Sequence, residues 1–486
     1  MRIIGNNPAA ENAEITAVAS GTLPSGQPVI VNADGTVSVV AETSGTESLG
    51  SHTTFEGGET TNVSATFDSS AGKIVVAYVD EANTTRGTAV VGTVSGTAIS
   101  FGTPVVFESG VTSFVSATYE ANAQKVVIAY QDASNSSHGT AVVGTVSGTS
   151  ISFGAAVVFE SNGVSRGYST AYDFLAQKIV IAYQHDGNLD YGTAVVGTVS
   201  GTSISFGTPV VFESAAISSA SATYANSSSK IVIAYTDKGN LDYGTAIVGT
   251  VSGTSISFGT AAVFESASTN YASAVYSIAS EKVIISYRDN GNSGYGTSIV
   301  GTVDGTSISF GTPVVFESAS TSFISSGYDV NAQRVVIGYR DIGNTNNGTL
   351  VVGAVSGTSI SFTSPLVYET GTNGYTSVTY DSAANKTVIA YVEELSLKDG
   401  RAVAYQPAYT NTNLTSENFI GFANGAAADT GKAKVDIGCG INDAQSGLTA
   451  GQTYYVQTDG TLGLTAADPS VIAGTAISAT EIIVKG

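Results

Sequence analysis

The chain lacks tryptophan and has a single cysteine, Cys439, among its 486 residues. One cysteine cannot form a disulfide within the chain, so stability must come from packing. Because no paired histidine motif accompanies it, the sequence predicts that this thiol is buried and inert. Charged residues are scarce at 12%, and acids outnumber bases to give a net charge of −21. This sign of charge argues against binding to nucleic-acid phosphates or to an anionic membrane surface.

Long apolar runs are also missing. No segment approaches 18 uninterrupted apolar residues, so we expect no insertion into a membrane. The N-terminal residues lack the apolar core of a signal peptide, and we expect no export by that route. Good helix formers are scarce, whereas glycine, serine, threonine and valine dominate. This composition is typical of an all-β protein with many turns.

The most informative feature that is present is a unit repeated seven times. A tyrosine that follows an apolar run recurs every 52 or 53 residues, at Tyr78, Tyr130, Tyr183, Tyr235, Tyr287, Tyr339 and Tyr391. A glutamate that follows an aromatic residue recurs at the same interval, at Glu56, Glu108, Glu160, Glu213, Glu265, Glu317 and Glu369. A fixed period of this length indicates a solenoid, an array or a propeller. The recurring aromatic residues are expected to pack between neighbouring units.

Each unit shows four β-strand patterns. In the second unit they cover residues 115–119, 125–130, 139–146 and 150–153, and the last leads on to 157–159. Clusters of Gly, Asn, Asp and Ser bound these runs, and no helical period competes with them. Seven units of four antiparallel strands predict a seven-bladed β-propeller. An open β-solenoid is the alternative, although its coils are usually shorter and need terminal caps.

The two ends of the repeat region bear on whether the ring closes. The seventh unit stops after residues 400–405, without the Ser-Gly-Thr-Ser-Ile-Ser-Phe segment of most other units. The missing piece precedes the first unit, where residues 48–56 align with residues 100–108. We therefore expect an N-terminal strand to complete the last blade, which would remove two exposed sheet edges.

One face of the predicted ring differs from unit to unit. The connections that follow the recurring glutamate and the recurring tyrosine should open on this face, because antiparallel strands alternate their ends. Aromatic and polar residues on variable loops above a rigid scaffold are typical of a recognition surface. Drift in unselected loops is the alternative interpretation. The candidate ligand-binding residues are Phe114, His138, Arg166, Tyr191, Tyr243, Tyr271, Tyr295, Phe323 and Tyr375.

Residues arranged for catalysis or metal binding do not stand out. The Asp-x-x-Asn pattern, as at Asp132 and Asn135, fits an Asx turn better than a calcium site, because each copy supplies only one or two carboxylates. Hydrolysis by paired carboxylates requires a unique pair, whereas every acid on this face has equivalents in other units. The three histidines are scattered and suggest neither a metal site nor a catalytic triad. We expect no enzymatic activity, no cofactor and no metal.

The two ends of the chain do not carry the repeat but are similar to each other. Residues 26–37 match residues 451–462 at a constant offset of 425, and each segment is predicted to form two strands joined by an Asp-Gly turn. We therefore expect three regions. Residues 1–43 and 407–486 together form a small β-module for anchoring or oligomerisation, and residues 44–406 form the propeller.

Residues 20–37, 417–423, 444–462 and 473–486 resemble structural proteins of marine tailed bacteriophages, and so do the Val-Gly-Thr-Val-Ser-Gly-Thr-Ser-Ile-Ser-Phe-Gly-Thr repeats. The resemblance implies a virion component in a tail fibre, tail tip or head appendage, assembled in the host cytoplasm. It brings no catalytic residues with it.

The expected function is adsorption to a host-surface glycan or protein. The terminal module would then bind other virion proteins, or form a homo-oligomer. A purely structural decoration protein is the first alternative, and a propeller enzyme that degrades polysaccharide is the second.

Overall fold

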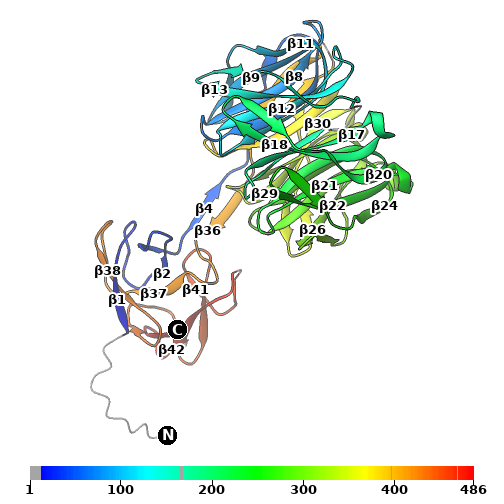
Figure 1. The fold of residues 1–486 in the computed structure, drawn as a ribbon. Helices are drawn as coiled ribbons and strands as arrows, with labels where there is room; N and C mark the ends of the chain where they lie inside the picture. Colours follow the sequence, from blue (N-terminus) through cyan, green and yellow to red (C-terminus); the bar gives the residue numbers. More distant parts are fainter. Residues whose placement is uncertain (1–12, 165–167, 396, 468, 486) are drawn as a thin grey trace. The chain divides into compact units, whose positions relative to one another are not determined.

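The computed structural model describes residues 13–164, 168–395, 397–467 and 469–485, and these residues are all-β apart from short 3₁₀ turns. Residues Glu47–Pro407 form one compact unit, the repeat domain. The residues up to Thr46 and those from Ala408 onward form a second unit, the terminal domain (Figure 1). Among the described residues, no helix is long and apolar enough to cross a membrane.

The second strand of each unit lies at the centre of the packing. Both faces of this strand are buried. In β12 (Lys125–Asp132), for example, six consecutive residues are buried. Strands of this kind are covered by neighbours on both faces. The other second strands are β8 (Lys73–Asp80), β17 (Lys178–His185), β21 (Lys230–Asp237), β25 (Lys282–Asp289), β29 (Arg334–Asp341) and β34 (Lys386–Glu393).

The third strand pairs with the second and carries a short fourth strand at its far end. The third strands are β9 (Arg86–Ser95), β13 (His138–Ser147), β18 (Tyr191–Ser200), β22 (Tyr243–Ser252), β26 (Tyr295–Asp304), β30 (Asn347–Ser356) and β35 (Asp399–Gln406). The fourth strands are β10 (Ala98–Phe101), β14 (Ser150–Phe153), β19 (Ser203–Phe206), β23 (Ser255–Phe258), β27 (Ser307–Phe310) and β31 (Ser359–Phe362). Four 3₁₀ turns precede third strands, at η1 (Asp186–Asn188), η2 (Lys238–Asn240), η3 (Asn290–Asn292) and η4 (Ile342–Asn344).

The sequence predicts a loop after each recurring glutamate. In four of the seven units this segment is instead part of a long β-strand, so the prediction is wrong there. In β11 (Val105–Glu120) the first half pairs with β9 of the preceding unit and the second half pairs with β12 of its own unit. A β-bulge between Ser113 and Ser116 redirects the strand, so the chain passes between units without leaving the ladder. The equivalent long strands are β20 (Val210–Ala225), β24 (Ala262–Ser277) and β28 (Val314–Asp329).

Elsewhere the same path is divided into two strands. The first strands of the remaining units are β7 (Thr60–Asp68), β16 (Ser169–Asp173) and β33 (Asn373–Asp381). Separate outer strands are β15 (Val157–Glu160) and β32 (Leu366–Glu369). Two short N-terminal strands, β5 (Ser48–Leu49) and β6 (Thr53–Glu56), pair with β35 of the seventh unit. The sheet of the seventh unit is therefore built from both ends of the repeat domain, as the sequence predicts.

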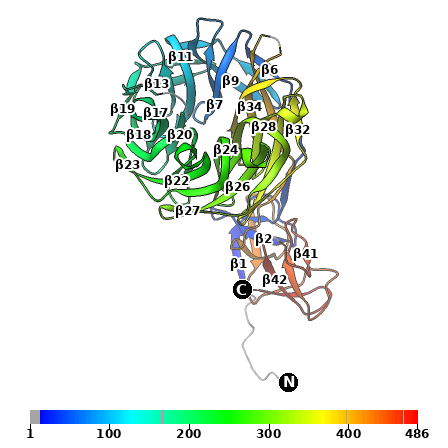
Figure 2. The same ribbon diagram turned by 90° about the vertical axis from the view of Figure 1, so that its right-hand side faces the viewer.

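Serine side chains join the first strands of neighbouring units. The Oγ of Ser64 accepts a hydrogen bond from the Ala117 N–H at 3.0 Å, and the Oγ of Ser377 accepts one from the Ala65 N–H at 2.9 Å. The second of these bonds joins the seventh unit to the first. The remaining N–H to serine pairs are Thr170 to Ser116, Ala222 to Ser169, Ala274 to Ser221, Ser326 to Ser273 and Val378 to Ser325. The seven bonds form a cycle, and the seventh unit lies beside the first (Figure 2).

The terminal domain contains two five-stranded antiparallel sheets and a separate pair of strands. The first sheet has the order β1 (Glu14–Val18), β38 (Lys432–Asp436), β37 (Phe419–Ala423), β2 (Pro28–Val31) and β3 (Val37–Val39). The second has the order β39 (Ile441–Asn442), β43 (Ile482–Val484), β42 (Val471–Ala476), β40 (Thr453–Val456) and β41 (Leu462–Gly463). The separate pair is β4 (Glu42–Gly45) with β36 (Tyr409–Thr412).

Cys439 is exposed, so the prediction of a buried thiol is wrong. It occupies a turn between β38 and β39 with a φ of 70°, and its N–H donates to the Val484 carbonyl at 3.0 Å. The tight turn holds the backbone in place and directs the side chain outward. The exposure of Cys439 follows from the conformation of this turn, which the composition of the chain does not reveal.

Candidate functional site

First strands line a cavity of about 250 Å³, which we call the first-strand cavity. All of its lining residues belong to the first strands of six units. Five of these strands contribute two neighbouring residues each, and the strand of the second unit contributes one. They are Asn62, Val63, Val115, Ser219, Ala220, Tyr271, Ala272, Phe323, Ile324, Tyr375 and Thr376. In the third unit the corresponding residues are 167, which lies outside the described part of the chain, and Tyr168.

One position of the first strand differs in residue type from unit to unit and has an unusual backbone. Its φ is 50° at Phe114, 54° at Tyr271, 50° at Phe323 and 46° at Tyr375, and Asn62 and Ser219 share this conformation. A positive φ is uncommon for residues other than glycine and is an outlier for bulky ones. In the four strands that have an aromatic residue here, the position lies within the β-bulge. Backbone strain of this kind tends to collect at binding sites, so the position is a candidate for function.

Three of these residues form a continuous set of rings, which we call the aromatic arc. The ring centres of Tyr271 and Phe323 are 5.5 Å apart, and those of Phe323 and Tyr375 are 5.1 Å apart. All three side chains are half-buried. The Arg340 guanidinium lies over the Phe323 ring, 4.6 Å from its centre, and is held there by Glu394 and by the Asn373 carbonyl. Burial raises the pKa of Tyr375, and the nearby Glu394 carboxylate adds to this shift.

Phe114 occupies the same position in the second unit but does not belong to the arc. Its ring stacks on Tyr168, with centres 6.4 Å apart, while its neighbour Val115 lines the cavity. Arg166, also a sequence candidate, lies outside the described residues. The structure therefore brings Tyr271, Phe323 and Tyr375 together and places Phe114 against Tyr168 instead.

The other four candidates lie elsewhere. His138, Tyr191, Tyr243 and Tyr295 are each the first residue of a third strand and are half-buried. Tyr191, for example, pairs across the sheet with Ala216, which lies in the first half of the long strand β20. The expectation that all nine candidates sit on loops is thus corrected, because the eight described ones belong to strands. The four at the third-strand start do not line the first-strand cavity.

The recurring tyrosines and glutamates bond to each other. Tyr130 is fully buried and donates its hydroxyl hydrogen bond to Glu108 at 3.0 Å, across the boundary between two units. The same bond occurs in every unit, at 2.7 to 3.2 Å. The prediction that these tyrosines pack between units is confirmed. Each glutamate is committed to a buried hydroxyl, so the seven carboxylates serve the structure rather than an open acidic surface.

Burial shifts the pKa values of the recurring glutamates and tyrosines. It raises the pKa of Glu265 and of Glu317, with the tyrosine hydrogen bond acting in the opposite direction. The tyrosine pKa values are also raised, first by burial and then by the adjacent glutamate. The aromatic residue before each glutamate packs on the tyrosine, as Phe107 does on Tyr130 with centres 5.2 Å apart.

The aspartates after the recurring tyrosines cap turns. Asp132 accepts a hydrogen bond from the Asn135 N–H at 3.0 Å, and Asp80, Asp237, Asp289 and Asp341 do the same for the residue three positions on. This is the Asx turn that the pattern predicts. Within the described residues there is no group of three or more His, Cys, Asp or Glu side chains suited to a metal ion.

Sequence reasoning missed a charged cluster that is unique to the seventh unit. Arg401 stands where the other units have threonine, and it contacts Glu369 at 3.2 Å, Glu393 at 3.4 Å and Asp399 at 3.5 Å. Glu369 also accepts the Tyr391 hydroxyl at 2.7 Å. Arg401 lies opposite Thr54 of β6, so the cluster stabilises the ladder that joins the two ends of the repeat domain. The signal that reveals it is the break in an otherwise constant threonine position.

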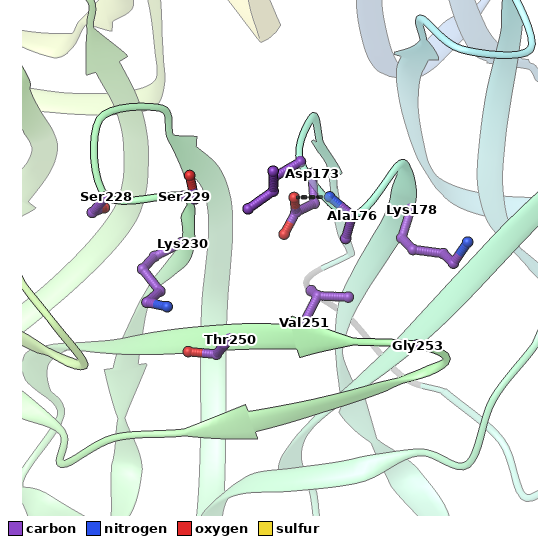
Figure 3. Close-up of a pocket in the computed structure, with 10 residues that line it drawn as sticks. Asp173, Ala176, Lys178, Ser228, Ser229, Lys230, Thr250, Val251 and Gly253 are labelled. Carbon is purple, nitrogen blue, oxygen red and sulfur yellow. Dashed lines mark hydrogen bonds between the residues drawn. The ribbon is translucent and has the colours of Figure 1, made fainter.

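A larger hollow, of about 490 Å³, opens at the other ends of the strands (Figure 3). Lys178, Lys230 and Asp173 line it, and Asp173 accepts a hydrogen bond from the Ala176 N–H at 2.8 Å. A lysine or arginine begins the second strand of every unit. Because these residues recur while those of the first-strand cavity differ between units, the first-strand cavity is the better candidate for specific recognition.

No protein-family model matches the sequence, and no curated protein is significantly similar to it. Among solved structures, the repeat fold is similar to the BP39L lectin from Burkholderia pseudomallei, with a TM-score of 0.54 and 11% identity over 74% of this chain and 98% of the lectin. A protein of unknown function from Dyadobacter fermentans has a TM-score of 0.45 and 13% identity over 75% of this chain and 98% of that one. At these identities the similarity concerns the fold alone.

Proposed function

We propose that the repeat domain is a seven-bladed β-propeller, and that the chain is a non-enzymatic virion surface protein that binds a host-surface glycan in the first-strand cavity. The cycle of serine hydrogen bonds and the pairing of β5 and β6 with β35 support a closed ring. The virion assignment rests on the resemblance to structural proteins of marine phages. The terminal domain would attach the protein to other virion components.

The aromatic arc is the observation that carries the glycan proposal. The negative face of an aromatic ring attracts the positively polarised C–H groups of a sugar, and rings of this size bury a large area. Arg340 beside Phe323 and the polar residues Asn62, Ser219 and Thr376 can supply the few oriented polar contacts that small-molecule sites use. The similarity of the fold to a lectin agrees with this proposal.

The charge of the chain narrows the glycan class. A net charge of −21 repels anionic polymers at long range, so we expect an uncharged glycan. Several copies on one particle would raise the overall affinity even if each cavity binds weakly.

A glycan array probed with the full chain tests the proposal. We expect uncharged glycans to bind, and we expect the Phe323→Ala variant to bind about tenfold more weakly, since an aromatic contact contributes about 0.5–1.5 kcal/mol. Tyr243→Ala is the matched control, because this tyrosine is half-buried in the same domain but does not line the cavity. Binding that is equally sensitive to both variants would contradict the assignment of the site. Absence of binding to any glycan would favour the decoration protein instead.

A further inference from the structure

The two sheets of the terminal domain have the same topology. Numbered in chain order within each sheet, the strands run first, fifth, fourth, second, third in both. We call β1, β2, β3, β37 and β38 module A, and β39 to β43 module B. The repeat domain lies in the sequence between the third and fourth strands of module A. Module B has the same strands without an insertion.

The correspondence extends to single residues. In module A, Val29 pairs with Gly421 and Ile30 with Phe419, which leaves a bulge in β37. In module B, Tyr454 pairs with Gly474 and Tyr455 with Ile472, which leaves the same bulge in β42. A Cβ atom on either glycine would collide with a backbone oxygen of the next strand, that of Asp436 or of Ile483. Together with the sequence match between residues 26–37 and 451–462, this identifies the modules as two copies of one unit.

One face of module A is covered by module B. Ile30 and Phe422 are 2% and 0% exposed and belong to one hydrophobic cluster with Tyr454 and Val456 of module B. Asp436 on the same face accepts a hydrogen bond from the Asn442 side chain of module B at 2.8 Å.

The corresponding face of module B is open among the described residues. Ile441, Ile472 and Ile483 are 42%, 38% and 40% exposed. Ile441 and Ile483 are cross-strand partners, and Ile472 is the partner of the half-buried Tyr455. With the exposed Thr475 opposite Ile483, these residues form a continuous surface across neighbouring strands, which we call the B face.

We propose that the B face is the contact between copies of this chain, formed when the B faces of two chains pack against each other. The internal arrangement supplies the precedent, because the equivalent face of module A is already covered by a module of the same chain. The B face is also uncharged, whereas module A has Glu14 and Asp436 at the equivalents of Ile441 and Ile483. Copies that each carry a charge of −21 repel one another, and an uncharged apolar patch is where they can approach. A two-fold symmetric pair brings the same surface of each copy together, so the B faces of the two copies would meet in it.

Sedimentation equilibrium of the full chain tests the proposal independently of glycan binding. We expect the unmodified chain to form a dimer or a dimer-based assembly, and the Ile472→Lys/Ile483→Lys variant to sediment as a monomer. The matched control is Val211→Lys/Val263→Lys, which places the same charges on valines of the repeat domain that are 43% and 45% exposed, and it should stay associated.

Thr475→Lys serves as a second variant, because this residue is already exposed and polar and its replacement leaves the packed side of the sheet untouched. It should weaken association at least tenfold while the thermal unfolding midpoint stays the same. An unmodified chain that is monomeric at micromolar concentration would overturn the proposal. Association that persists in both B-face variants would overturn it as well.

Discussion

At the scale of single residues, the repeat is held together by a buried hydroxyl and its acceptor. The sequence predicts that the recurring tyrosines pack between units, and all seven are fully buried. The role of the glutamates was not predictable, because their partner lies in the neighbouring unit and 22 or 23 residues away in sequence. The aromatic arc was only partly predictable. Tyrosine and phenylalanine do not favour a positive φ, so nothing in their identity indicates the strained position they share.

Removing one such hydroxyl should destabilise the repeat domain. Tyr235→Phe removes the donor from the half-buried Glu213 carboxylate, and we expect a loss of about 1 kcal/mol in the free energy of unfolding. Urea unfolding measures this loss. Tyr243→Phe, at a half-buried tyrosine of the same unit, is the control. Equal stability of the two variants would show that the tyrosine–glutamate pair contributes little.

At the scale of strands, the pattern of short apolar runs located the second and third strands but not the long first strands. Connections such as residues 108–114 look like loops because they are rich in Ser, Gly and Thr. They stay extended because their backbone groups pair with third strands on one side and second strands on the other. Tertiary hydrogen bonds overrule the local preference of the sequence here.

The bulge in each first strand gives a prediction at this scale. Ser219 has a φ of 53°, a conformation that glycine adopts without strain, and Gly167 stands at the equivalent place in the sequence. Ser219→Gly relieves this strain but removes the Oγ that accepts the Tyr271 N–H at 3.3 Å, so the two effects oppose each other and the stability of the protein should change by less than about 1 kcal/mol. Ser221→Gly, two residues on, should destabilise it, because Ser221 accepts the Ala274 N–H. Denaturant midpoints of the two variants check this contrast, and a Ser219→Gly variant destabilised as much as Ser221→Gly would contradict it.

At the scale of the whole molecule, the period of the repeat was evident from the sequence, whereas the duplication in the terminal domain was only half visible. Residues 26–37 match 451–462, but the remaining strands of the two modules share the bulge and its glycine rather than an extended sequence match. The long insertion also separates the third and fourth strands of module A, which hides the equivalence from any local comparison.

The buried carboxyl groups predict how stability depends on pH. Burial raises the pKa of Asp237, Glu265, Glu317, Asp329 and Asp341 above the values of the unfolded chain. Between the unfolded and folded pKa values the folded state binds more protons, so stability falls as pH rises through that window. Acidification from neutrality to about pH 4.5 should therefore raise the unfolding midpoint, and weaker self-repulsion acts in the same direction.

Thermal unfolding across this pH range measures the effect. Glu265→Gln should flatten the dependence, since the amide can still accept the Tyr287 hydroxyl but does not titrate. Stability that rises steadily toward neutral pH would contradict this account of the carboxyl groups.

The central claim is that the first-strand cavity binds a glycan. An experimental structure of the full chain with a glycan selected by binding tests it most directly. The account predicts density for a sugar ring against Tyr271, Phe323 or Tyr375. Density in the hollow between Lys178 and Lys230, or at the third-strand residues Tyr191, Tyr243 and Tyr295 with an empty first-strand cavity, would contradict it.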